Sequence, residues 1–307
     1  MSIRLAAAAA LLAAAFFLPT RAGAQASPQA RPGYVLSASL AAPGKNMDHI
    51  ENPFDVCLDA AGNVYVVAES RVAKMKPDGT LLMEFGAAGT GAGQFMNASG
   101  LALDGKGNVF VSDPFTDRVQ EFTPAGVFIG EIGSEGAGDG QFNGPLGIAV
   151  DGSGTIYVAD TGNARIQKFS GTGEFLGSFG SSGTADGQFG APRWLALDGK
   201  GNVFVVDNTH FRVDKFTTAG TFVSAFGTRG NGDDQFANPQ GIAVDPAGNV
   251  FVMDGLVVKK FDGSGHFLTA FGRQQISSGL GIALDSQGRV YVARNGPNCV
   301  SVFKPVP

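Results

Sequence analysis

Six side chains that could bind a ligand stand out, because each interrupts a pattern that the rest of the chain repeats. They are Asp55, Arg193, Trp194, His210, Gln240 and Arg294. A single indole ring among cationic, amide and carboxylate groups suits a small polar ligand, a saccharide or a peptide segment. The sequence therefore predicts a binding pocket lined by these six residues. An equally weighted alternative is that Trp194 fills a central channel as packing.

The interrupted pattern is a unit of about 47 residues that occurs six times. Its centre is an apolar run, an aspartate, a short turn and a second apolar run, as in 147–158 and 241–252. The aspartate recurs in every copy, at Asp59, Asp104, Asp151, Asp198, Asp245 and Asp285. A repeat at this period is typical of a solenoid or a propeller.

Each unit contains four short strands. In the third copy we predict them at 147–150, 155–159, 166–169 and 175–179. The turn at 151–154 carries glycine where the backbone needs a positive φ. Four antiparallel strands per repeat describe one blade of a propeller. We therefore predict an all-β fold, a six-bladed β-propeller of four-stranded antiparallel blades.

The ring is predicted to close through a strand near the N-terminus. The last copy stops after its third strand at 300–303, and 33–39 resembles the fourth strand of the fourth copy at 220–226. The early strand would complete the sixth blade and lock it to the first. Phenylalanines at the ends of third and fourth strands are predicted to pack between blades. They are Phe85, Phe122, Phe169, Phe179, Phe216, Phe226, Phe261, Phe271 and Phe303.

With this unit in view, the chain resembles the NHL-repeat propellers and is similar to exported bacterial proteins of that family. The resemblance rests on 138–151 and 160–169, with further Gln-Phe and Pro matches at 187–192 and 234–239, and it covers 33–304. It implies the six-bladed fold. Relatives serve as protein-binding scaffolds, RNA binders, sensor domains and amidating lyases, so the resemblance implies no single activity.

The same resemblance argues against a metal-dependent lyase. Those relatives hold zinc with channel-facing histidines just ahead of the inner strand. The corresponding residues are Asp55, Gly100, Gly147, Trp194, Gly241 and Gly281, and none is histidine. His49, His210 and His266 fall at three different places in the repeat. We expect no metal site and no cofactor; a structural calcium ion in the channel, as relatives carry, stays open.

Residues 1–24 have the features of a secretory signal peptide, with Arg4 before an apolar run at 5–18 and small residues at 22–24. Residues 25–307 would then form a single propeller domain. Cleavage removes Arg4 and Arg21 and no acidic residue, so the formal charge moves from −5 to −7. An acidic protein is a poor partner for phosphate backbones. We expect a periplasmic or extracellular protein with no membrane span and no nucleic-acid partner.

Two further groups are predicted to be structural or redox-related. The pairs Asp113/Arg118, Asp160/Arg165 and Asp207/Arg212 keep one spacing across a loop, and we expect each to hold that loop. Cys57 and Cys299 lie in blades that become neighbours on closure. Because a disulfide needs Cα atoms within roughly 7 Å, both a disulfide and two free thiols stay open.

The predicted function is an exported interaction module that binds a protein, peptide or saccharide on its loop-rich channel face. The alternative is a hydrolase or lyase in the channel, with or without a divalent ion. Catalysis would require a nucleophile–base pair or several converging metal ligands, and Asp55 and His210 are the candidates for such a pair.

Overall fold

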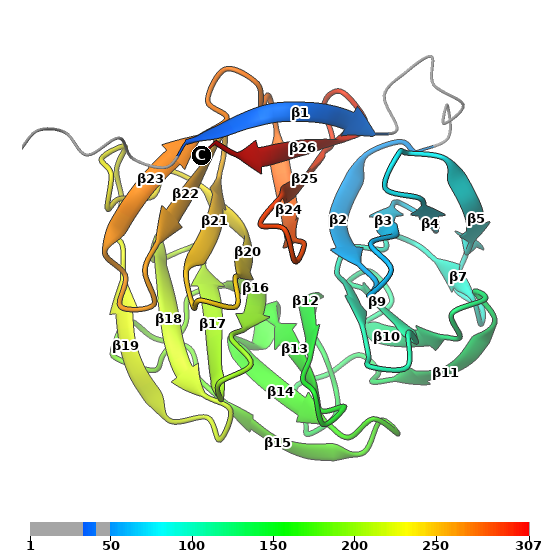
Figure 1. The fold of residues 1–307 in the computed structure, drawn as a ribbon. Helices are drawn as coiled ribbons and strands as arrows, with labels where there is room; N and C mark the ends of the chain where they lie inside the picture. Colours follow the sequence, from blue (N-terminus) through cyan, green and yellow to red (C-terminus); the bar gives the residue numbers. More distant parts are fainter. Residues whose placement is uncertain (1–32, 41–49, 307) are drawn as a thin grey trace, which may run out of the picture. The chain divides into compact units, whose positions relative to one another are not determined.

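The computed structural model describes residues 33–40 and 50–306, and the predicted signal peptide lies outside them. These described residues form six four-stranded antiparallel sheets and one two-stranded sheet. The inner strand of each four-stranded sheet contacts that of the next, from β2 (Pro53–Leu58) round to β24 (Gly279–Leu284), which contacts β2 again. Figure 1 shows the sheets as blades around a common centre. The fold is the predicted six-bladed β-propeller.

Blades 1 to 3 each follow chain order from the inner to the outer strand. Blade 1 consists of β2, β3 (Val64–Ala68), β4 (Arg71–Met75) and β5 (Leu81–Phe85). Blade 2 consists of β8 (Leu101–Leu103), β9 (Val109–Asp113), β10 (Arg118–Phe122) and β11 (Phe128–Ile132). Blade 3 consists of β12 (Pro145–Val150), β13 (Ile156–Asp160), β14 (Arg165–Phe169) and β15 (Phe175–Phe179). The short strands β6 (Ala87–Ala88) and β7 (Gln94–Phe95) lie between blades 1 and 2, and the 3-10 helix η1 (Thr161–Asn163) lies between β13 and β14 of blade 3.

Blades 4 and 5 follow the same order, and blade 6 takes its outer strand from the other end of the chain. Blade 4 consists of β16 (Pro192–Leu197), β17 (Asn202–Asp207), β18 (Arg212–Thr217) and β19 (Phe222–Phe226). Blade 5 consists of β20 (Pro239–Val244), β21 (Val250–Asp254), β22 (Val257–Phe261) and β23 (Phe267–Phe271). Blade 6 consists of β24, β25 (Val290–Arg294), β26 (Cys299–Pro305) and β1 (Tyr34–Leu40).

The repeated aspartate shapes the turn after each inner strand. In blade 3, Asp151 Oδ1 accepts hydrogen bonds from the backbone N–H groups of Ser153 and Thr155, both at 2.9 Å. Gly154 follows with a φ of 88°, a conformation that glycine adopts without steric cost. Equivalent bonds form at Asp59, Asp104, Asp198, Asp245 and Asp285. These carboxylates are therefore turn-forming groups, as the sequence predicts.

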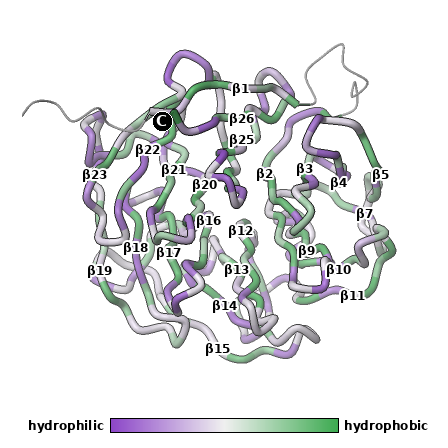
Figure 2. Tube along the Cα trace, in the orientation of Figure 1, coloured by the Kyte–Doolittle hydropathy of each residue, from purple (hydrophilic) through white to green (hydrophobic). Residues whose placement is uncertain are grey.

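Aromatic rings join neighbouring blades, as predicted. The phenylalanine that ends a fourth strand lies on the one that ends the third strand of the next blade. The ring centroids are 4.9 Å apart for Phe85/Phe122 and Phe179/Phe216, 5.0 Å for Phe226/Phe261 and 5.4 Å for Phe271/Phe303. Between blades 2 and 3, Ile132 takes the place of the first ring. Figure 2 shows the hydrophobic stretches along the strands that these contacts bury.

The ring closes through β1, which pairs antiparallel with β26 as the sequence predicts (Figure 1). At one end of β1, Tyr34 stacks on Phe271 of blade 5 with centroids 4.2 Å apart. At the other end, the buried Leu40 belongs to one apolar cluster with Met75 of blade 1. A short strand of seven residues thus contacts both neighbours of blade 6.

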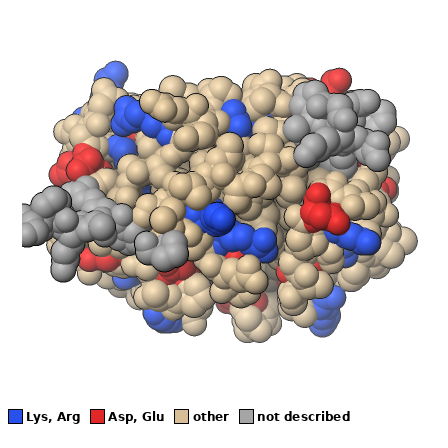
Figure 3. All heavy atoms as spheres, turned by 45° about the horizontal axis from the view of Figure 1, so that its top comes forward, with Lys and Arg blue, Asp and Glu red and all other residues tan. Residues whose placement is uncertain are grey.

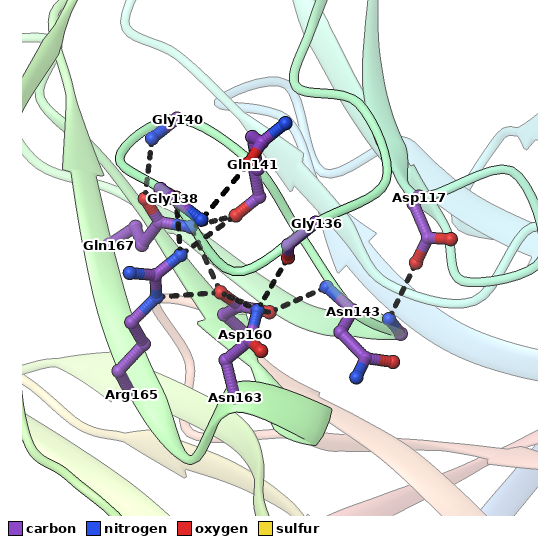
Figure 4. A network of polar contacts seen from close by, with 11 residues as sticks. Asp117, Gly136, Gly138, Gly140, Gln141, Asn143, Asp160, Asn163, Arg165 and Gln167 are labelled. Atoms are coloured by element: carbon purple, nitrogen blue, oxygen red, sulfur yellow. Dashed lines mark hydrogen bonds and ion pairs between the residues drawn. The ribbon is translucent and has the colours of Figure 1, made fainter.

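The second strand of blades 2 to 5 ends in an aspartate that binds the incoming linker between blades. Asp160 accepts hydrogen bonds from the Asn143 N–H at 2.8 Å, from the Asn163 and Gln167 amides, and from Arg165 Nε at 2.8 Å (Figure 4). The carboxylate is fully buried, so these donors offset its loss of hydration. The network fixes where each linker enters its blade.

Of the three Asp/Arg pairs that the sequence predicts to hold a loop, only one is an ion pair. Asp160 and Arg165 form an ion pair, but Arg118 binds Glu131 at 2.8 Å and Arg212 binds Asp214 at 3.0 Å. All three arginines donate to two linker carbonyls, which the sequence could not reveal. The linker contact is therefore the common function, and the acidic partner varies.

Cys57 and Cys299 are both free thiols, so the predicted alternative of a disulfide between them is not realised. Within 33–40 and 50–306, no helix has the length and apolar character needed to cross a membrane.

The closure can be tested with two substitutions in β1. Leu40→Ala removes a buried side chain from the contact with blade 1, and we expect unfolding free energy to fall by about 2–4 kcal/mol. The matched control is Leu36→Ala, because Leu36 is 40% exposed in the same strand and should change stability by less than about 1 kcal/mol. Urea unfolding followed by fluorescence measures both; equal effects would contradict this closure.

Candidate functional site

The connections between strands divide between two faces of the propeller. The linkers between blades and the loops between second and third strands lie on one face, which we call the loop face. The turns after first strands and after third strands lie on the other, the turn face. This division follows from the alternating direction of the four strands. The six predicted site residues belong to the loop-face half of their blades.

The inner strands approach one another closely at the position just ahead of each apolar run. A Cβ added to Gly147 would lie 2.7 Å from the carbonyl oxygen of Arg193 and from the Cα of Trp194. A Cβ added to Gly281 would lie 2.5 Å from the Cα of Asp55. Since real side chains do not tolerate such distances, glycine is required at both positions. Asp55 and Trp194 therefore carry the large side chains in a tightly packed ring.

Asp55 is buried between blades 1 and 2, with 6% of its surface exposed. Its Oδ1 accepts from the Val56 N–H at 2.9 Å, and its Oδ2 accepts from the Leu101 N–H of blade 2 at 3.1 Å. Burial raises the pKa of this carboxyl to about 7, although the two backbone hydrogen bonds and Trp194 act in the opposite direction. Asp55 thus joins two blades with a carboxyl that titrates near neutral pH.

Trp194 is also buried, with 6% of its surface exposed. Its ring belongs to the apolar cluster between blades 4 and 5, with Phe236 and Ile242. The indole lies close enough to Asp55 to lower the pKa of that carboxyl, but Nε1 does not meet hydrogen-bond geometry with any group of the described residues. Blade 4 lies opposite blade 1 in a ring of six, so the indole extends across its centre.

Arg193 and Gln240 are brought together from the inner strands of blades 4 and 5. Arg193 Nη1 donates to Gln240 Oε1 at 3.1 Å. Gln240 is buried, and its Nε2 donates to Asn238 Oδ1 at 2.8 Å. Asn208 Nδ2 donates to the same Asn238 oxygen at 3.1 Å. The amide chain therefore fixes which end of Gln240 faces the guanidinium.

The Arg193 guanidinium is partly buried, and its hydrogen-bond partner Gln240 is uncharged. Among the residues that the structure describes it forms no ion pair, and its Nε is buried without a hydrogen bond. Desolvation lowers the pKa of Arg193, which means that its positive charge is partly dehydrated and lacks a nearby carboxylate. At the corresponding position blades 3 and 6 carry Leu146 and Leu280.

His210 and Arg294 bond within their own blades. His210 Nδ1 lies 2.7 Å from Asp207 Oδ2, and Arg294 donates to Ser301 Oγ at 2.8 Å and to Ser277 Oγ at 3.1 Å. The described contacts do not join either residue to Asp55. The structure therefore assembles two pairs, Asp55 with Trp194 and Arg193 with Gln240, and leaves two residues apart.

Sequence reasoning missed two features of the molecule. Asn208 and Asn238 are ordinary loop residues in the sequence, and only the adjacency of blades 4 and 5 brings them to Gln240. Two cavities lie on the turn face, one of about 770 Å³ between blades 2 and 3 and one of about 540 Å³ beside the inner strands of blades 1 to 3. A break in the repeat, Glu121 among lysines, is the signal that could have indicated them.

The distribution of charged residues does not indicate a binding site on the loop face or on the turn face. In the view of Figure 3, which brings the β1 side forward, acidic and basic residues form small separate groups on a largely uncharged surface. In the described part of the chain, no three His, Cys, Asp or Glu side chains gather as metal ligands would. Neither candidate site is therefore marked by a large patch of one charge or by a cluster of metal ligands among the described residues.

The raised pKa of Asp55 predicts a pH-dependent contribution to stability. The unfolded value is about 3.9, so the folded state holds a proton between about pH 4 and pH 7 that the unfolded state has lost. Stability from this group is complete below pH 4 and is lost as pH rises through 7. Relative to Asp55→Gly, the residue of four other blades, wild type should lose ~3 kcal/mol between pH 4.5 and 8.

The measurement is urea unfolding of both proteins across that range, with Asp78→Asn as the control. Backbone hydrogen bonding lowers the pKa of the exposed Asp78, so its contribution should rise with pH. A wild-type minus Asp55→Gly difference that stays constant with pH would show that Asp55 is ionised throughout.

Comparison with known proteins identifies one repeat type within the chain and solved structures with the same fold. The NHL repeat model matches residues 142–169, and a search of curated proteins gives no match. Virginiamycin B lyase from Staphylococcus aureus, crystallised as an inactive variant with quinupristin, aligns with a TM-score of 0.62 at 15% identity, over 89% of this chain and 88% of that one. A gluconolactonase from Xanthomonas campestris aligns with a TM-score of 0.64 at 14% identity, over 89% and 99%. The chain is therefore a six-bladed β-propeller that contains an NHL repeat at residues 142–169.

Proposed function

We propose that this propeller is an exported, non-enzymatic binding module that takes a peptide, protein or saccharide bearing a carboxylate on its loop face. One observation carries the proposal: Arg193 is a half-buried cation with no acidic partner among the described residues. A dehydrated charge is costly unless an opposite charge or several hydrogen bonds compensate for it. A ligand carboxylate would supply both.

The surroundings of Arg193 support the same ligand class. Gln240 accepts from one guanidinium nitrogen and is itself held by Asn238, so the guanidinium is oriented before a ligand arrives. Pre-orientation reduces the entropy lost on binding. Arginine can present paired N–H donors to a carboxylate. The predicted contacts of His210 and Arg294 with the ligand stay proposals.

A channel enzyme is the second candidate, and the structural neighbours named as a lyase and a gluconolactonase motivate it. At about 15% identity they support the fold alone. The nucleophile–base pair that the sequence suggests would need His210 near Asp55, whereas His210 bonds to Asp207 and Asp55 bonds to Leu101. The observations therefore favour binding over catalysis.

The binding proposal can be tested with an array of acidic oligosaccharides and acidic peptides alongside their neutral counterparts. We expect wild-type protein to prefer acidic probes, and Arg193→Leu to lose at least tenfold in affinity, since a hydrogen bond to a charged group contributes about 1.5–3 kcal/mol. Leucine occupies this position in blades 3 and 6, so the variant should fold. Arg273→Leu changes an exposed linker arginine and is the control. No preference for acidic probes would refute the proposal.

A second variant separates charge from packing. Gln240→Glu places a carboxylate where the amide oxygen now contacts Arg193, so the new side chain should neutralise the guanidinium. We expect Gln240→Glu to lose acidic-probe binding while its melting temperature stays within a few degrees of wild type. If the variant keeps wild-type affinity, the charge of Arg193 does not determine binding.

A further inference from the structure

A large cavity lies on the turn face, away from Arg193. It has a volume of about 770 Å³ and separates blades 2 and 3. Its walls come from the first turn of blade 2, the outer strand β11 and both turns of blade 3. Asp104, Lys106 and Gly152 also border the cavity of about 540 Å³ beside the inner strands, so the two are continuous along this face.

The wall contains an exception to the repeat. In four blades the third strand carries a lysine just ahead of its final apolar residue, at Lys74, Lys168, Lys215 and Lys260. Two of these lysines pair with the turn aspartate of their blade, Lys74 with Asp59 at 3.3 Å and Lys260 with Asp245 at 3.7 Å. Blade 2 has Glu121 at this place. A carboxylate thus stands where the repeat supplies a cation.

Glu121 and Asp104 share one amide group. Asn108 Nδ2 donates to Glu121 Oε1 at 3.0 Å and to Asp104 Oδ2 at 3.1 Å. Burial and the charge of Asp104 raise the pKa of Glu121, and the Asn108 bond and the Lys106 charge oppose this rise. Glu131, also in the wall, already binds Arg118. The exposed Lys106 is therefore the cation beside this pair of carboxylates.

Apolar side chains border the same cavity. Ile129 is 48% exposed and Ile132 is mostly buried, and both line the cavity from β11. Backbone and hydroxyl groups of 152–154 and 170–173 form the opposite wall. The cavity thus combines two carboxylates at one end with a strip of aliphatic surface.

We propose that this cavity binds a primary alkylammonium group, with its methylene chain against Ile129 and Ile132 and its nitrogen at Glu121 and Asp104. An ammonium group presents three N–H donors, which suits two carboxylate oxygens and one further acceptor. Its positive charge replaces the one that lysine supplies in other blades. The shared chemistry fits a free polyamine or a lysine side chain of a peptide.

The test is titration calorimetry at 150 mM salt with spermidine, with a tri-lysine peptide and with calcium chloride. The decisive variant is Glu121→Lys, which restores the residue type of four other blades and should therefore fold. The matched control is Glu174→Lys, which makes the same charge change at an exposed turn-face residue outside the cavity wall.

We expect spermidine or tri-lysine to bind one site on wild-type protein, with the stronger of the two identifying the source. Glu121→Lys should lose at least tenfold in affinity, and Glu174→Lys should stay within about twofold. No amine binding, or equal losses in both variants, would overturn the proposal. Stoichiometric calcium binding that amines fail to displace would assign the cavity to a metal ion instead.

Discussion

The structure depends on burial of the two faces of each blade by its neighbours. A four-stranded sheet cannot cover its own faces, and a ring of blades solves this without leaving an end blade exposed. The contact is made by aromatic rings, such as Phe179 on Phe216 with centroids 4.9 Å apart. Offset or tilted pairs of this kind add to the energy of simple burial. Four of the six junctions between blades use this contact between two phenylalanines.

Where the ring closes, the chain replaces this contact with smaller ones. Leu40 and Met75 share the cluster between blades 6 and 1, and Tyr34 extends the stacking to Phe271. The closing strand is held by backbone pairing with β26 along its length. Closure therefore rests on main-chain hydrogen bonds with one apolar anchor at either end.

The candidate sites use positions that the packing does not require to be uniform. Where the inner strands of neighbouring blades come closest, four blades have glycine because a Cβ atom would clash with the next strand. The other two blades have Asp55 and Trp194 at this position, and Asp55 bonds to the backbone of blade 2. One row nearer the loop face, Arg193 and Gln240 replace leucine and form a polar pair between blades. On the turn face, Glu121 replaces lysine beside Asp104. Each exception changes charge or polarity while the surrounding cluster of phenylalanines stays the same.

Much of the fold could be predicted because the same pattern of apolar runs and turn residues occurs six times in the sequence. The strands of blade 3 were placed to within about two residues, and the pairing of 33–40 with the last blade followed from one missing strand and one extra strand. The Asp/Arg pairs were predicted less well. An arginine is long enough to reach several acceptors, so spacing alone could not choose between Asp113 and Glu131 for Arg118.

The sequence by itself determined the blades, their number, the order of closure and the list of irregular residues, because these depend on periodicity and on local turn chemistry. Only the tertiary structure decided which irregular residues meet. Arg193 meets Gln240 and Trp194 reaches Asp55 because neighbouring or opposite blades converge at the centre of the ring, whereas His210 and Arg294 find partners in their own blades. Those contacts join residues far apart in the chain, and their distances follow from the closure of the ring and not from any local pattern.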